Sequence, residues 1–139
     1  MIHVAWDKKY SVGYERIDNE HKVFIDLVQA NTNFIDAQMD SDFVGRHLEE
    51  LVLYAKFHFF SEENLMIDSQ YPHYEAHKEA HLQLMEELEQ KIVLYKENQE
   101  FGESLIEFIF EWFVMHTLNT DKQLANYLNE YEYQILIKK

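Results

Sequence analysis

The sequence predicts an all-α protein, an antiparallel up-down-up-down four-helix bundle with an extended N-terminal arm. Only three glycines and one proline occur in 139 residues, of which 47% are hydrophobic, and this composition is typical of a compact, mainly helical chain. Four segments repeat hydrophobic residues at steps of three and four, as amphipathic helices do. The connections between these segments are short, so consecutive helices are expected to run antiparallel.

Residues 1–17 are expected to form the arm. Trp6, Gly13 and scattered charges occur there without helical periodicity, which favours an extended conformation. Trp6 and Tyr10 are large aromatic residues that can anchor such a segment on the body of the protein. We therefore expect the arm to lie against the bundle.

Capping residues mark the first two helices. Asp18 or Asn19 can cap the first helix, which should end near Met39. Asp40 or Ser41 opens the second helix. The expected inner faces are His21, Phe24, Ile25, Val28 and Ile35 in the first helix, and Leu48, Leu51, Tyr54, Ala55, His58, Glu62 and Leu65 in the second.

Ser69 and Pro72 mark the start of the third helix, because proline costs little near a helix start. This helix should run to about Lys96, and the polar residues 97–100 should precede the fourth. The expected inner face of the third helix is His77, His81, Leu84, Leu88 and either Ile92 or Val93. The fourth helix carries Leu105, Phe108, Ile109, Trp112, Phe113 and His116, and a helical pattern continues towards the end with Leu124, Tyr127, Leu128, Tyr131 and Ile135. We expect one domain over residues 1–139.

Composition excludes several classes of partner and site. The formal net charge of −14 should repel phosphate backbones and anionic lipids, so neither nucleic acid nor a membrane is an expected partner. The absence of cysteine excludes disulfides, iron–sulfur clusters and thiolate chemistry, so any metal must be held by nitrogen and oxygen. The sequence shows neither a signal-peptide core nor a membrane span, and we expect a cytoplasmic protein.

Four polar side chains recur within the hydrophobic stripes of two predicted helices. His58 and Glu62 are four residues apart, and so are His77 and His81. Side chains at this spacing lie on the same face of a helix, so all four are expected to point into the core. An unpartnered polar group costs about 1–3 kcal/mol there, and a divalent metal would remove that cost.

The other two helices add donors to the same layer. His21 lies on the inner face of the first helix and His116 on that of the fourth, and Asp121 follows His116 by five residues. Five residues of a regular α-helix turn a side chain about 140° away from the first. Because both side chains can face the core only if the helix widens, we predict a wide turn or π-type bulge between them.

Hydrogen-bonded core histidines are the alternative interpretation. That interpretation fits a single inward histidine, but it leaves little room for five inward histidines and two inward carboxylates from all four helices. His3, His47 and His73 lie in the arm, off the core stripe and at a helix start, and we assign them no ligand role. Seven donors exceed what one tetrahedral zinc takes and suit two adjacent octahedral ions, with iron as the leading choice.

The order of these residues resembles the hemerythrin signature, in particular that of the bacterial single-domain members. The resemblance covers nearly the whole chain and every ligand position. The residues that carry it are His21, His58-x-x-x-Glu62, His77-x-x-x-His81 and His116 with Asp121, together with Trp6, Val12-Gly13, Asp18-Asn19-Glu20-His21 and Trp112.

The resemblance implies a non-heme di-iron centre that binds dioxygen reversibly at an open position of one iron. It also implies that His77, His81 and His116 bind one iron and that His21 and His58 bind the other. Glu62 and Asp121 would bridge the two irons, together with a solvent-derived oxo or hydroxo group.

Aromatic residues near the expected ligands are placed to wall a dry pocket at the open position. They are Phe59, Trp112 and Phe113, and ordinary core packing is the alternative role for them. Thr117 follows His116 where many members of the family have isoleucine. Its hydroxyl could admit water or donate a proton, so faster autoxidation is expected.

Binding is favoured over catalysis, because five of the seven donors are neutral imidazoles and no Glu-x-x-His pair occurs among them. We therefore expect an oxygen carrier, store or delivery protein that is not an enzyme. A di-iron oxidase or peroxidase, an oxygen- or redox-sensing module that acts through a partner, and iron or zinc handling are the alternatives. Nitric oxide or other small anions are further expected ligands of the open iron, and an oxygen-consuming enzyme is the expected protein partner.

Overall fold

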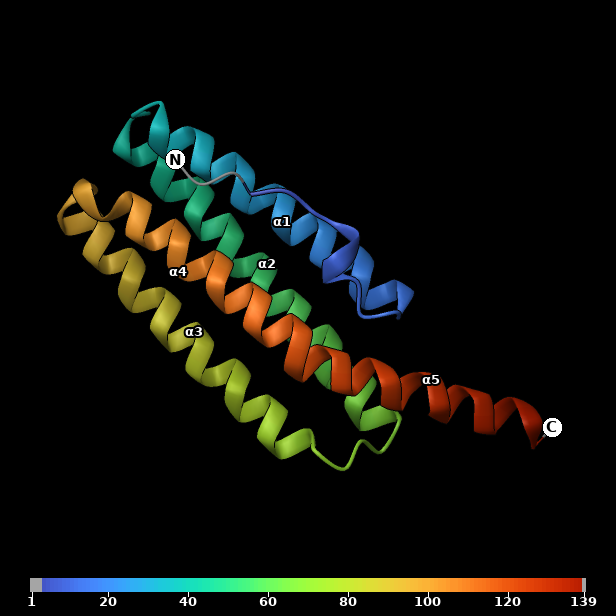
Figure 1. Ribbon diagram of the computed structural model, residues 1–139. Helices are drawn as coiled ribbons and strands as arrows, with labels where there is room; N and C mark the ends of the chain where they lie inside the picture. Colours follow the sequence, from blue (N-terminus) through green and yellow to red (C-terminus); the bar gives the residue numbers. More distant parts are fainter. Residues whose placement is uncertain (1–3, 139) are drawn as a thin grey trace.

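The computed structural model describes residues 4–138 and shows them as an antiparallel bundle of long helices (Figure 1). The helix α1 contacts α2 and α4, and α3 also contacts α2 and α4, so the bundle closes on itself. This arrangement confirms the predicted all-α up-down-up-down fold. The elements are η1 (Lys8–Tyr10), α1 (Glu15–Asp36), α2 (Ser41–Asp68), α3 (Tyr74–Glu97), η2 (Gln99–Phe101), α4 (Gly102–Met115), the π-helical turn η3 (His116–Asp121) and α5 (Lys122–Ile137).

The N-terminal arm lies along α1, as predicted (Figure 1). The backbone N–H of Val4 donates to Oε1 of Gln29 at 3.0 Å. Tyr10 is buried, and its ring meets Phe113 of α4 edge-on with ring centroids 5.8 Å apart. The arm therefore covers the seam between α1 and α4.

The predicted cap of α1 is wrong. The helix begins at Glu15 after Tyr14, whose side chain makes no capping hydrogen bond. Asp18 is instead a helical residue that accepts hydrogen bonds from Ser11 Oγ at 2.6 Å and from the backbone N–H of Val12 at 2.8 Å. Its carboxylate thus holds the arm, a role that depends on tertiary contact and that a local capping pattern does not reveal.

The first helix also ends earlier than predicted. It stops at Asp36 rather than near Met39, because Gln38 has a left-handed φ of 53° that no right-handed helix can continue. The second helix begins at Ser41 directly after Asp40, as predicted.

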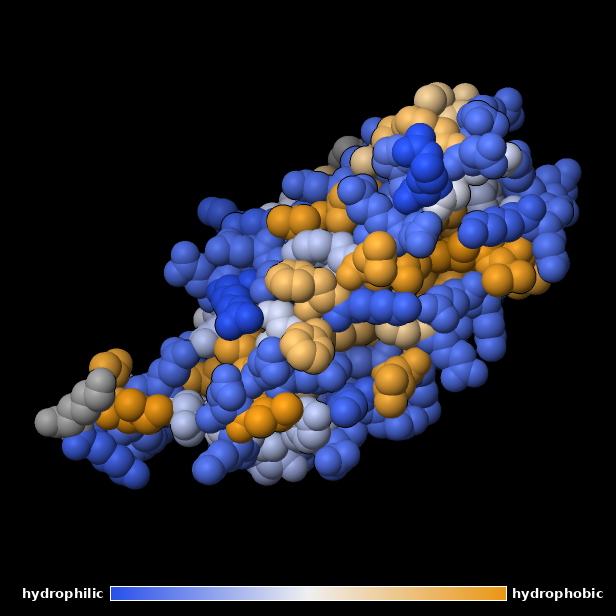
Figure 2. All heavy atoms as spheres, turned by 180° about the vertical axis from the view of Figure 1, so that it is seen from behind, coloured by the Kyte–Doolittle hydropathy of each residue, from blue (hydrophilic) through white to orange (hydrophobic). Residues whose placement is uncertain are grey.

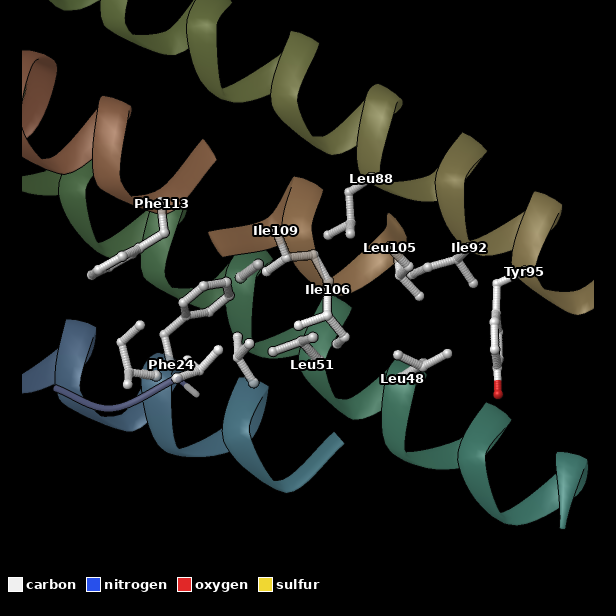
Figure 3. Close-up of a cluster of buried hydrophobic side chains, with 14 of the residues drawn as sticks. Phe24, Leu48, Leu51, Leu88, Ile92, Tyr95, Leu105, Ile106, Ile109 and Phe113 are labelled. Atoms are coloured by element: carbon white, nitrogen blue, oxygen red, sulfur yellow. The ribbon is translucent and has the colours of Figure 1, made fainter. Parts of the chain in front are cut away.

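Two hydrophobic clusters form the core, and the predicted metal ligands lie between them. Phe24, Leu51 and Ile109 belong to the larger cluster (Figure 3), and Ile17 and Met66 belong to the smaller one. The same order recurs on each long helix of the bundle, where the ligands separate residues of one cluster from residues of the other. The ligand layer is therefore closed off from water on both sides.

The structure shows which residues of α3 face the core and how far the core extends along α5. Ile92 is buried and Val93 is 54% exposed, so Ile92 is the core residue. In α5, Ile135 continues the helical pattern as expected, but its side chain is 41% exposed. The last turns of α5 project beyond the ends of the other helices (Figure 1), and hydrophobic side chains are visible on this projecting end (Figure 2). Within residues 4–138, no neighbouring helix covers them.

None of the helices in residues 4–138 combines the length and the hydrophobicity that a bilayer span requires.

Candidate metal centre

All seven predicted ligands are buried and converge at one layer of the bundle. Their ligating atoms form two groups, and the atoms of each group lie within 4.8 Å of one another. The groups are Glu62, His77, His81, His116 and Asp121, and His21, His58, Glu62 and Asp121. Both groups therefore share the two carboxylates, while the histidines divide into a set of three and a set of two.

Glu62 presents one oxygen to each set of histidines. Its Oε1 lies 2.9 Å from Nε2 of His81 and 3.3 Å from Nε2 of His77. Its Oε2 lies 3.2 Å from Nε2 of His58 and 3.9 Å from Nε2 of His21. The carboxylate thus stands between the two sets.

Asp121 repeats this arrangement from the fourth helix. Its Oδ1 lies 3.0 Å from Nε2 of His116 and 3.2 Å from Nε2 of His77. Its Oδ2 lies 3.0 Å from Nε2 of His21. Two carboxylates that each face both sets have the geometry of bridging ligands for two adjacent ions.

The π-helical turn explains how His116 and Asp121 reach the same layer. The turn spans His116–Asp121, as the five-residue spacing predicted. Hydrogen bonds from residue i to i+5 widen the helix, so a five-residue step returns close to the same face. Both side chains are buried, which confirms the predicted widening of the helix.

Most of the converging atoms are buried without a hydrogen-bond partner among residues 4–138. They are Nε2 of His58, His77, His81 and His116 and both carboxylate oxygens of Glu62 and Asp121. Each such atom costs about 1–3 kcal/mol unless something satisfies it. Imidazole and carboxylate donors suit iron, so the residues present fit a pair of iron ions.

Electrostatics keep the two carboxylates ionised. Burial and the charge of Asp121 act to raise the pKa of Glu62, yet His58 and His77 hold that pKa well below its ordinary value. Burial likewise acts to raise the pKa of Asp121, while His116 and His21 hold it well below the usual range. Both side chains are therefore available as anionic ligands.

A cavity of about 10 Å³ adjoins the two-histidine set, which is room for roughly one water-sized molecule. His21 and His58 both line it, as do His116 of the three-histidine set and the shared carboxylate Asp121. The other lining residues are apolar: Phe24, Ala55, Phe59, Trp112 and Phe113. The three aromatic residues predicted to wall a pocket are thus among its lining residues. Thr117 is buried but does not line this cavity, so its suggested influence stays a prediction.

His47 and His73 lie away from this layer. The Nδ1 atom of His47 is 2.8 Å from the carbonyl oxygen of Phe43, and His73 is exposed at the start of α3. His3 lies outside the described residues.

Two further carboxylates contact histidines that were predicted to be ligands, and sequence analysis missed both. Glu20 Oε1 lies 2.7 Å from Nδ1 of His58, and Glu63 Oε2 lies 3.0 Å from Nδ1 of His81. Each is next to a ligand in the sequence, Glu20 before His21 and Glu63 after Glu62. That adjacency is the signal that could have identified them.

Comparison with known proteins agrees with this geometry. Residues 12–128 match the model of the hemerythrin HHE cation binding domain. A bacteriohemerythrin of Pseudomonas aeruginosa is 29% identical over 123 residues, which cover 87% of this chain and 78% of the relative. A myohemerythrin of Theromyzon tessulatum is 31% identical over 117 residues, which cover 84% of this chain and 86% of the relative.

A bacteriohemerythrin of Clostridium acetobutylicum is 24% identical over 125 residues, which cover 86% of this chain and 96% of the relative. No solved structure gives a significant match. The chain therefore belongs to the hemerythrin family, whose domain holds a di-iron centre.

Proposed function

We propose that this protein binds dioxygen reversibly at its di-iron centre and acts as an oxygen carrier, store or delivery protein. Domains of the hemerythrin family bind dioxygen at the iron site, which supports the proposal. The observation that carries it is the unequal division of the site, with three histidines on one side of the shared carboxylates and two on the other.

The proposed ligands follow from that division. His77, His81 and His116 would hold one iron, and His21 and His58 the other, with Glu62, Asp121 and a solvent-derived oxo or hydroxo group as bridges. The first iron then has the six donors of an octahedral ion, while the second has one donor fewer. The second position is therefore the one open to a diatomic ligand.

The cavity beside the two-histidine set supports this assignment. It is lined by both histidines of the two-histidine set but by only His116 of the other set, and it is only large enough for about one small molecule. When bound, the iron pair supplies an open coordination position and two electrons that dioxygen takes up and later returns. The apolar side chains of Phe59 and Phe113 exclude water from the cavity, which favours release of unchanged dioxygen over loss of a reduced product.

Other functions remain alternatives to be separated by experiment. A di-iron oxidase or peroxidase would consume dioxygen steadily in the presence of a reductant. A sensing module would bind dioxygen in the same way but would need a protein partner to pass on the signal. Nitric oxide or another small anion would compete with dioxygen for the same open position.

The test is a difference spectrum of the iron-loaded protein. The chain is reduced without oxygen, exposed to air and then deoxygenated, and the charge-transfer band between ligand and iron is followed. We expect the band to appear with air and to disappear on deoxygenation. His58→Gln should abolish it, while His73→Gln, a matched change at an exposed histidine, should not.

A band that never forms in the wild-type protein would contradict reversible binding. Steady oxygen consumption with reductant would replace the carrier proposal by the enzymatic alternative.

A further inference from the structure

Glu20 and Glu63 contact ligand histidines from the side opposite the proposed irons. Glu20 meets Nδ1 of His58 at 2.7 Å, and Glu63 meets Nδ1 of His81 at 3.0 Å. The other ring nitrogen, Nε2, faces the carboxylate of Glu62 in both histidines. The distance is 3.2 Å from Nε2 of His58 to Oε2 and 2.9 Å from Nε2 of His81 to Oε1. Each contact therefore fixes a ring whose second nitrogen is aimed at a proposed iron position.

The two carboxylates occupy corresponding places on successive helices. Glu20 precedes the ligand His21 on α1 and contacts α2, while Glu63 follows the ligand Glu62 on α2 and contacts α3. Adjacent residues of a helix project about 100° apart. One member of each pair thus enters the core, and the other reaches the next helix.

Contacts from α2 hold Glu20 in place. Ser61 Oγ donates to Glu20 Oε2 at 2.8 Å, and Tyr54 Oη donates to the Glu20 carbonyl oxygen at 2.9 Å. Arg16 Nε lies 3.5 Å from the same Oε2, and only 14% of the Glu20 side chain is exposed. The carboxylate is therefore anchored, so it can restrain the ring of His58.

We propose that Glu20 and Glu63 are positioning residues, one for each iron: Glu20 orients His58 at the two-histidine position, and Glu63 orients His81 at the three-histidine position. The proposal rests on the ligand assignment under the proposed function. A carboxylate that accepts from Nδ1–H leaves the lone pair of Nε2 free for a metal and makes the ring a stronger donor. Its negative charge also favours the higher oxidation state of the coordinated ion.

The test replaces each carboxylate by the amide of the same shape. Glu20→Gln and Glu63→Gln keep an acceptor for Nδ1–H but lose the charge. Glu50→Gln is the matched control, because Glu50 is an exposed residue of α2. Iron retained per chain under a chelator challenge and the midpoint potential of the bound iron are measured for all of them.

We expect the two site variants to bind iron about 10–100-fold more weakly, as losses of such partners typically cause, and therefore to release it faster to the chelator. The midpoint potential should rise in both, and the control should match the wild type. Ser61→Ala, which removes a support of Glu20 without changing charge, should shift retention in the same direction by less. Thermal unfolding of the iron-free chains identifies any variant that fails to fold.

Unchanged iron release and potential in folded Glu20→Gln and Glu63→Gln would overturn the positioning role. In that case a wild type that holds two irons and takes up oxygen reversibly would leave the proposed function intact. A wild type that does not hold two irons would overturn the proposed function instead, so the two failures are distinguishable.

Discussion

The ring of Tyr10 meets the ring of Phe113 edge-on, with ring centroids 5.8 Å apart. Phe113 lines the cavity beside His21 and His58, whereas Tyr10 belongs to the arm. The arm thus supports one wall of the cavity from outside. This pair of rings therefore links the stability of the fold to the exclusion of water from the site.

Removal of the Tyr10 ring should lower the stability of the fold and let water reach the site. Tyr10→Ala is expected to lower the free energy of unfolding by roughly 3 kcal/mol, because a large buried aromatic ring is lost. It should also speed autoxidation, since water gains access behind Phe113. Urea unfolding and the decay of the oxygenated spectrum measure the two effects. Tyr133→Ala is the control, because Tyr133 is 57% exposed; equal autoxidation in the two variants would refute the supporting role of the arm.

Asp121 should be required for the second iron. Asp121→Asn removes an anionic oxygen from both groups of ligands, and we expect at most one iron per chain by elemental analysis. Asp26→Asn, a matched change at an exposed position of α1, should leave the iron content unchanged. Two irons held as tightly by Asp121→Asn as by the wild type would show that Asp121 is no bridge.

Tyr14 should make stability depend on pH in the alkaline range. Its hydroxyl donates to Glu132 Oε1 at 2.6 Å, and burial together with this bond raises its pKa from 10.0 to about 12. The folded state thus favours the neutral phenol, so the contribution is complete below pH 10.0 and is lost as the pH rises toward 12.

Tyr14→Phe should therefore show a shallower loss of unfolding free energy across this range than the wild type. Urea unfolding at several pH values measures the difference. Parallel profiles for the two proteins would exclude the contribution.

Thr117 should influence autoxidation through its hydroxyl. Thr117→Val keeps the shape of this buried residue but removes the group that can donate a proton or hold water, so we expect slower autoxidation. Thr120→Val is the comparison in the same turn. An autoxidation rate that does not change in Thr117→Val would eliminate this hypothesis.

The layer of buried histidines and carboxylates could be predicted because polar residues on a hydrophobic stripe conflict with the local pattern. His58 and Glu62 interrupt an otherwise apolar face, and burial without a partner is too costly to be accidental. The five-residue step from His116 to Asp121 conflicts with helical geometry in the same informative way, and the structure contains the π-helical turn that it predicted.

The errors arise where distant contacts decide. Asp18 has the side chain of a helix cap, but the arm uses it. Ile135 continues a hydrophobic repeat, yet it is exposed because α5 extends beyond the ends of the other helices. Glu20 and Glu63 resemble solvated surface residues until the neighbouring helices are in place. In each case the local pattern is read correctly, but the role of the residue depends on which distant segment packs against it, and the local sequence does not contain that information.

The π-helical turn contains one residue more than the bundle needs. Counting from His116, the buried residues Asp121, Leu124 and Leu128 follow at steps of five, three and four. Deletion of one exposed residue of the turn, such as Leu118 or Asn119, would convert the first step to four. The core face of α5 would then follow from α4 as one ordinary α-helix. The extra residue is therefore dispensable for packing, and we expect a chain without it to fold. The side chains of His116 and Asp121 would then no longer have the relative orientation that the π-helical turn gives them.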